Sequence, residues 1–344
     1  MGIFRHLEAA ARTSGDRPVD WDEVARAVKA SVDPGSLDLS ETDQQAYATN
    51  VRKARDRIRE VSGLDVDIPD DIYLLDRHQA IDTHVQSIKY ISNTTRDGEF
   101  DDPLGILNRM RTGLASAEIE GSASFILARY QSGITAWDDE LDALFFVPPN
   151  VAQAASESDV LYSRYLRSLA HYEVAHAAVH DAAPWVTEYG RTRLGSITSK
   201  DLGDLYHPLK TKHPSANIRE LLAVLTIVAG YALRLLRESA GGTIVDIGWE
   251  TSKHTPQTSW YKHLGGQSNV WLPAVGERFL AEVEHVHGGE AVEAVLDSPE
   301  NLPTFEELGF VNSQPEPRRS GTESNGTADA PLDGVSHWAE RVDP

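Results

Sequence analysis

The chain of 344 residues contains no cysteine, so disulfide bonds and thiolate metal sites are both excluded. Any zinc would have to be held by histidine, carboxylate or water. Positive charge is also scarce, because 32 Lys and Arg residues stand against 53 Asp and Glu residues and the formal net charge is −21. Nucleic acids and anionic membranes bind cationic surfaces, which this composition does not supply. We therefore predict neither kind of partner.

Long apolar segments are absent as well. The N-terminal sequence MGIFRHLEAAARTSGD has no apolar stretch typical of a secretory signal, and the longest apolar run, Leu221–Leu233, is too short for an ordinary membrane span. We expect a cytoplasmic protein with that run in a buried helix. The many acidic residues and few lysines are typical of proteins that work in concentrated salt, and they predict a halophilic source.

The spacing of apolar residues predicts a mainly α protein with a small β component. Ser40 is a favourable N-cap, apolar residues then recur every three or four positions, and Gly63 ends the run, so we expect one amphipathic helix between them. A second helical pattern runs from Pro103 to about Tyr130. The best strand candidate is the apolar run ALFFVP, residues 143–148.

We divide the chain into four parts, of which the first two make up most of its length. Residues 1–95 form an N-terminal helical portion, and residues 96–311 form the core. Within the core we predict one helix over residues 159–182, with Asp159 as its N-cap, and a second, buried helix over residues 216–239.

The remaining sequence is more polar. A helix expected around Pro273–His285 and the segment SPENLPTFEEL, residues 298–308, are placed at the surface because of their polarity. Residues 312–335 are acidic, rich in Pro, Gly, Ser and Thr, and nearly free of apolar side chains, which predicts a disordered linker. Residues 336–344 regain an aromatic side chain, and we expect them to dock on the core.

The segment SLAHYEVAHAAVHD, residues 168–181, nearly contains the zinc-hydrolase motif H-E-x-x-H. In that motif two histidines lie about 40° apart around a helix and reach one metal ion, and the glutamate acts as general base. Glu173 and His176 keep the required spacing, but Tyr172 stands at the first ligand position. His171 cannot replace that ligand, because it lies about 140° from His176 around the helix. A phenol is a poor zinc ligand at neutral pH, so the motif lacks one ligand.

A rearranged metal site stays open as an alternative. His176 and His180 are four residues apart and Glu173 precedes His176 by three, so E-x-x-H-x-x-x-H places three donors along one stripe of a helix. Such a site would need a further donor, such as Asp181 or a histidine of the loop between His254 and His263. The plainer interpretation is a histidine, a tyrosine and an acid that serve packing and hydrogen bonding.

The chain resembles a zincin-like family of zinc-dependent metalloproteases, found in actinobacteria and haloarchaea and often linked to deazaflavin coenzyme biosynthesis. The likeness runs nearly end to end and rests on the order in which similar segments follow one another. These segments are VDWDEVARAVKASVDPGSLDLS, LLDRHQAIDTHV, LFFVPPN, the motif helix with APWVTEY, VGERFLAEVE, SPENLPTFEEL and HWAERVDP. The resemblance implies a zincin-like, metallopeptidase-type helical fold and zinc-dependent hydrolysis.

The departures from this family fall at its expected zinc ligands. The family sequence H-E-V-T-H keeps Glu173 and His176 here, but Tyr172 replaces its first histidine. The family sequence E-G-H-A-E or E-G-Y-A-E, from which a carboxylate ligand is expected, has lost both acids to Ala229 and Leu233. A catalytic zinc site normally has three protein ligands, so the resemblance implies a degenerate copy.

The sequence supports three functional hypotheses. The first is a non-catalytic scaffold or binding protein with no cofactor, in which Glu173 is a vestigial general base and the partner is an unknown protein or a related active copy. The second is an active zinc-dependent metallohydrolase whose metal is held by His176 and His180 beside Glu173. The third is a metal-independent enzyme or a cofactor-binding protein, for which no nucleotide or phosphate motif is present.

Overall fold

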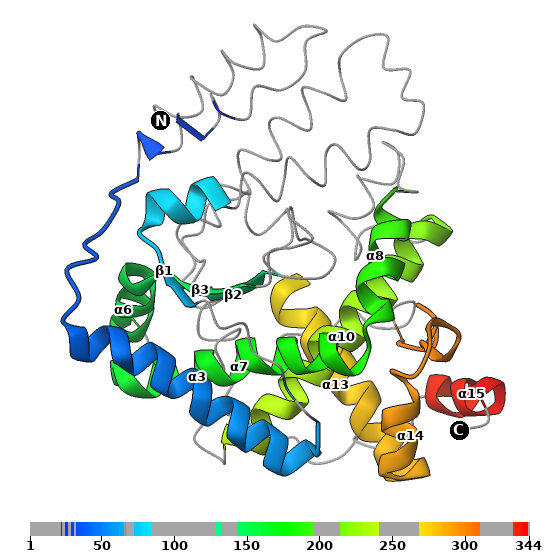
Figure 1. Ribbon diagram of the computed structural model, residues 1–344. Coiled ribbons are helices and arrows are strands. Elements are labelled where there is room, and N and C mark those ends of the chain that lie inside the picture. Colours follow the sequence, from blue (N-terminus) through cyan, green and yellow to red (C-terminus); the bar gives the residue numbers. More distant parts are fainter. Residues whose placement is uncertain are drawn as a thin grey trace, which may run out of the picture.

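The computed structural model describes residues 22, 25, 26, 29, 30, 32–64, 66, 72–83, 128–131, 143–157, 159–195, 214–240, 268–309 and 333–342. Helices predominate among them, and a small sheet lies at one side of the crossed helices α3 and α7 (Figure 1). The predicted mainly α fold with a small β component is confirmed. The elements follow in the order α3 (Glu41–Ser62), β1 (Ile72–Leu74), β2 (Ala128–Gln131), β3 (Ala143–Phe146), α6 (Pro148–Glu157), α7 (Tyr162–Ala182), α8 (Trp185–Gly195), α10 (Ala216–Ala240), α13 (Ser268–His287), α14 (Gly289–Ala294), the 3-10 helix η2 (Pro299–Asn301) and α15 (Asp333–Val342).

Helix α3 begins and ends at the residues that the sequence predicts. The Ser40 hydroxyl accepts a hydrogen bond from the backbone N–H of Asp43 at 3.2 Å, and Gly63 adopts the left-handed conformation at the C-cap with φ 70°. The helix packs against α7 and α10. In its predicted apolar stripe, Tyr47, Val51, Ala54 and Ile58 are at most 1% exposed, whereas the fifth member, Val61, is half-buried.

The sheet has the strand order β1-β3-β2, with β1 parallel and β2 antiparallel to β3. The central strand β3 is the one predicted from ALFFVP, and Leu144 and Phe146 in it are fully buried. The helical pattern expected up to Tyr130 is wrong at its end, because residues 128–131 pair with β3 as a strand. Pairing with a distant segment overrides the local helical preference there. The beginning of that pattern, at Pro103, lies outside the described residues.

The two central helices of the predicted core are present with shifted ends. Helix α7 begins at Tyr162, with Leu161 as N-cap, so the prediction of Asp159 as N-cap is wrong. Asp159 has φ 53°, a left-handed conformation that an N-cap residue does not adopt. Helix α10 spans Ala216–Ala240, and it contacts α3, α7, α8 and α13. Among the described helices, none combines the length and the apolar character that a membrane span requires.

The prediction that Pro273–His285 and residues 298–308 lie at the surface is wrong. Helix α13 fully buries Phe279, Leu280 and Val283. The segment over residues 298–308 likewise has an apolar side in the core, made of Leu302, Phe305 and Leu308. Both segments are amphipathic, so their average polarity reflects the solvent-facing side and conceals the buried one.

The C-terminal part of the chain ends in a helix that contacts α13. Helix α15 begins at Asp333, three residues before the docking segment that the sequence predicts. Residues 312–332 of the predicted linker lie outside the described residues, as do residues 1–21 and 84–95 of the N-terminal portion.

Helices α10 and α13 approach each other so closely that two positions have no room for a side chain. A Cβ atom at Gly276 would lie 2.0 Å from the carbonyl oxygen of Thr226, and one at Gly230 would lie 2.4 Å from the carbonyl carbon of Gly276. Glycine at both positions lets the two backbones meet. An ion pair between Arg234 and Glu284, with Nη2 and Oε1 2.7 Å apart, joins the same two helices.

The substitution Gly276→Ala is expected to lower the free energy of unfolding by about 3 kcal/mol or more, because the new methyl group meets backbone atoms that cannot turn aside. This loss opposes the intrinsic preference of a helix for alanine over glycine, which is about 1 kcal/mol. Urea unfolding followed by circular dichroism measures it. The matched control is Gly289→Ala, where nothing lies within 4 Å of the added Cβ and stability should change by less than about 0.5 kcal/mol. Equal stability of both variants would contradict the close crossing.

Candidate functional site

Helix α7 directs its first histidine away from the candidate site. His171 is 4% exposed, and its Nδ1 lies 2.9 Å from the Oγ of Ser239 on α10. Its side chain therefore takes part in the packing of α7 against α10. Because α7 is one continuous helix from Tyr162 to Ala182, the side chains of His171 and His176 leave it about 140° apart around its axis.

Tyr172 and His176 are in direct contact on another side of α7. Their ring centroids are 4.7 Å apart and their planes are inclined by 88°, which is the edge-to-face arrangement that aromatic rings prefer. Both side chains are half-buried, and Tyr172 also packs against the hydrophobic core. The residue at the expected position of the first ligand is therefore packed against the second.

The two remaining histidines of the near-motif are uncharged at neutral pH. Burial, with a smaller effect of the neighbouring His180, lowers the pKa of His176 to about 3. Burial lowers the pKa of His180 to about 4. Removal of a charged imidazolium from water is costly, so both rings are held in the neutral form. Neutral imidazole is also the form that binds a metal ion.

Glu173 is a buried acid, with only 7% of its surface exposed. It precedes His180 by seven residues, so the two side chains leave the helix about 20° apart. His176 lies between them along the helix. The sequence motif E-x-x-H-x-x-x-H thus lies along one stripe of an ordered helix.

Helix α10, which packs against α7, carries the second replaced position, Ala229. Ser239 near its end contacts His171 of α7, and Glu220 near its start accepts a hydrogen bond from Tyr189 of α8. Ala229 precedes Ser239 by ten residues, or about 15 Å along the axis of α10. Ala229 is half-buried and offers only a methyl group at this position.

The described residues do not fit a catalytic zinc site. Among them, no group of three or more His, Asp or Glu side chains is gathered closely enough to hold a metal ion. His176 and His180 are two neutral donors, whereas catalytic zinc normally has three protein ligands. Asp181 is exposed on α7, and His254 and His263 lie outside the part of the chain that the structure describes.

The structure brings together a pair of phenols that the sequence did not indicate. The hydroxyls of Tyr47 on α3 and Tyr162 on α7 are hydrogen-bonded to each other, and burial raises the pKa of both. Tyr47 also lines a pocket of about 400 Å³ beside Ile72 and Leu74 of β1. Tyr162 precedes His176 by 14 residues, or about 21 Å along α7, so this pocket is separate from the near-motif. The pairing joins residues 115 positions apart, which no local pattern signals.

Comparisons with known proteins relate this fold to one family and one solved structure. The family model described as zincin-like metallopeptidase matches residues 19–207, which include the near-motif. The crystal structure of a candidate hydrolase with a novel fold from Chloroflexus aurantiacus is similar, with a TM-score of 0.59 and 18% sequence identity over 90% of this chain and 97% of that chain. This likeness concerns the fold alone. No curated protein matches the chain.

The buried His171 is expected to make stability depend on pH. Burial, and then the positive charges of Arg167 and Arg57, lower its pKa to about 4, whereas the unfolded chain has a value of about 6.5. Between these two values, falling pH protonates the unfolded chain and not the folded one, so the free energy of unfolding decreases. The neutral His171 therefore makes its full contribution to the free energy of unfolding above about pH 6.5, and this contribution is lost by about pH 4.

The substitution His171→Gln should remove at most about 3 kcal/mol of this pH-dependent loss. Urea unfolding at about pH 7 and about pH 4 measures the difference between variant and wild type. His285→Gln, which alters an exposed side chain at the end of α13, is the matched control and should leave the profile unchanged. Parallel profiles of wild type and His171→Gln would contradict the assignment.

Proposed function

Since the zincin-like metallopeptidase model matches more than half of its length, this chain belongs to that family, and we propose that it is a non-catalytic member that acts by binding. The observation that carries the proposal is the edge-to-face contact between Tyr172 and His176. It supports a role of the ligand position in packing. In the proposal, Glu173 is a vestigial general base, because Tyr172 and Ala229 supply no ligands that would hold a metal-bound water beside it.

The chemistry of the two replaced positions supports the same conclusion. Tyrosine has an ordinary pKa near 10 and reaches further than imidazole, so Tyr172 is a poor substitute for a histidine ligand. Alanine has no donor atom, so Ala229 cannot supply the carboxylate expected from α10. One family histidine, His176, is then left from three expected ligands. A single imidazole does not hold zinc firmly at the concentrations at which three-ligand sites are filled.

The proposed partner is a protein, either an unrelated one or a related active copy. The formal charge of −21 disfavours nucleic acids and anionic membranes and favours a neutral or cationic protein surface. A cytoplasmic location, a halophilic source and a connection to deazaflavin coenzyme biosynthesis belong to the same proposal. No cofactor is required for an activity of this kind.

An active zinc-dependent metallohydrolase is the second candidate, and the neutral state of two adjacent histidines favours it. In this alternative, His176 and His180 bind the metal ion beside Glu173, with a further donor from Asp181 or from the segment that contains His254 and His263. Of these, His254 and His263 lie outside the described residues, which themselves gather no group of three donors.

Elemental analysis of the purified protein distinguishes the two candidates. We expect zinc well below stoichiometric amounts in the wild type, and near-stoichiometric zinc after the double substitution Tyr172→His and Ala229→Glu, which restores an imidazole and a carboxylate donor. Tyr172→Phe is the matched control, because it keeps the ring and supplies no ligand.

Stoichiometric zinc in the wild type, together with peptide hydrolysis that a chelator abolishes, would overturn the non-catalytic proposal. The alternative in turn requires His180, so His180→Ala should lower both metal content and hydrolysis. If both were unchanged in that variant, the rearranged site would be excluded.

A further inference from the structure

The C-terminal helix α15 is bound to a surface that we call the dock, made of Phe279 on α13 and residues 299–308. Trp338 is fully buried in it. Its indole N–H donates to the carbonyl oxygen of Asn301 at 2.6 Å, and its ring meets Phe279 edge-on with centroids 6.0 Å apart. Trp338 is thus an aromatic anchor with a satisfied polar group, which is the typical composition of a binding hot spot.

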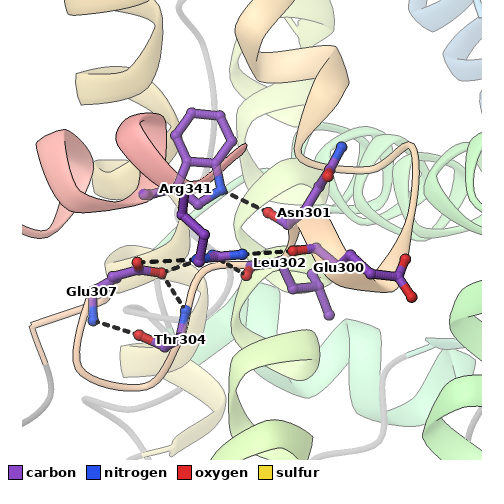
Figure 2. A network of polar contacts seen from close by, with 7 residues as sticks. Glu300, Asn301, Leu302, Thr304, Glu307 and Arg341 are labelled. Carbon is purple, nitrogen blue, oxygen red and sulfur yellow. Dashed lines mark hydrogen bonds and ion pairs between the residues drawn. The ribbon is translucent and has the colours of Figure 1, made fainter. Parts of the chain in front are cut away.

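Arg341 makes the polar half of the contact, as Figure 2 shows. Its Nη1 donates to the carbonyl oxygen of Glu300 at 2.6 Å, and its Nη2 donates to the carbonyl oxygen of Leu302 at 2.7 Å and to Oε2 of Glu307 at 3.0 Å. The Glu307 carboxylate is itself oriented, because it accepts the backbone N–H of Thr304 at 2.7 Å. One guanidinium therefore recognises two carbonyls and a carboxylate that the loop holds in place.

The dock complements α15 in shape and in charge. A Cβ atom at Gly334 would lie 1.9 Å from the carbonyl oxygen of Glu307, so the first turn of α15 rests directly on the dock. The side chain of Glu307 is only 10% exposed, so its negative charge is largely removed from water. The ion pair with Arg341 compensates this buried charge. Among the described residues, the side-chain hydrogen bonds of α15 all go to residues 300–307.

None of these contacts depends on how α15 is joined to the dock. The intervening residues 310–332 number 23 and can span up to about 80 Å when extended. We infer that α15 and the dock are a tethered ligand and its receptor, and that the partner which fits the dock is α15 of a second copy of this chain. Reciprocal exchange of the two helices produces a closed dimer with twofold symmetry. This inference is independent of whether the near-motif binds zinc.

Competition within one chain determines how much exchange occurs. A tethered group of this kind has an effective concentration on the order of 1 mM. At a protein concentration of about 10 µM, the helix of a second copy therefore occupies roughly 1% of docks, and the wild type is mainly monomeric. The exchanged form dominates only where the contact within one chain is weakened.

Opposite charge reversals in two full-length variants test the inference. Arg341→Glu places an acid against Glu307, and Glu307→Arg places a second base against Arg341, so each variant repels its own helix. In a mixture, each dock meets a helix of opposite charge. We expect monomers from either variant alone, and a dimer fraction at least about tenfold higher in the mixture, measured by light scattering during size-exclusion chromatography. The matched control carries both reversals in one chain and should be monomeric.

A second measurement does not rely on the folding of these variants. A labelled peptide of residues 333–344 should bind full-length Trp338→Ala, whose own helix lacks its anchor, and fluorescence anisotropy measures the affinity. The same peptide with Trp338→Ala should bind at least about tenfold more weakly. A mixture that stays monomeric, or a peptide that does not bind, would overturn the inference.

Discussion

The close crossing of α10 and α13 is the constraint on which the rest of this structure depends. Gly230 and Gly276 let the two backbones touch, and this contact sets the position of α10 within the core. Helix α10 then supports α3, α7 and α8 on its other sides, while α13 carries Phe279 toward the C-terminal helix. Helix α7, which carries the candidate site, packs against α10, and the dock includes Phe279 of α13, so both depend on the position of this helix pair.

In the proposed non-catalytic member, the stability of the scaffold does not depend on metal ligands. Its stability comes from apolar burial along α3, α7, α10 and α13, and the side chains at the replaced positions contribute to that burial or are neutral to it. Exchange of a histidine for Tyr172 adds an aromatic ring to the edge of the core, and exchange of an acid for Ala229 removes a charge that would need a partner. Under the proposed binding function, the zincin-like fold is kept without its catalytic chemistry, because its stability comes from apolar burial.

Local signals in the sequence predicted the elements that depend on local chemistry. The caps Ser40 and Gly63, the strand ALFFVP and the apolar run of α10 were all recognisable, because capping and burial leave patterns within a few residues. The strand β2 and the hydrogen bond between Tyr47 and Tyr162 depend on segments far away in the chain, and no local pattern reports them. The buried side of α13 was missed because the average polarity of the segment conceals its amphipathic pattern. The same limit applies to the candidate site. Helical geometry sufficed to separate His171 from His176, whereas the position of Ala229 relative to α7 follows only from how α10 packs.

The order of the dock and its helix along the chain has a consequence for synthesis. The ribosome completes Phe279 and residues 299–308 before it makes α15, so the surface around Phe279 lacks its Trp338 cover during elongation. The surface closes only after α15 has been made and reaches the dock. A nascent or prematurely terminated product displays an apolar patch beside an uncompensated carboxylate, and this patch distinguishes unfinished molecules from finished ones for the chaperones and proteases that survey newly made proteins.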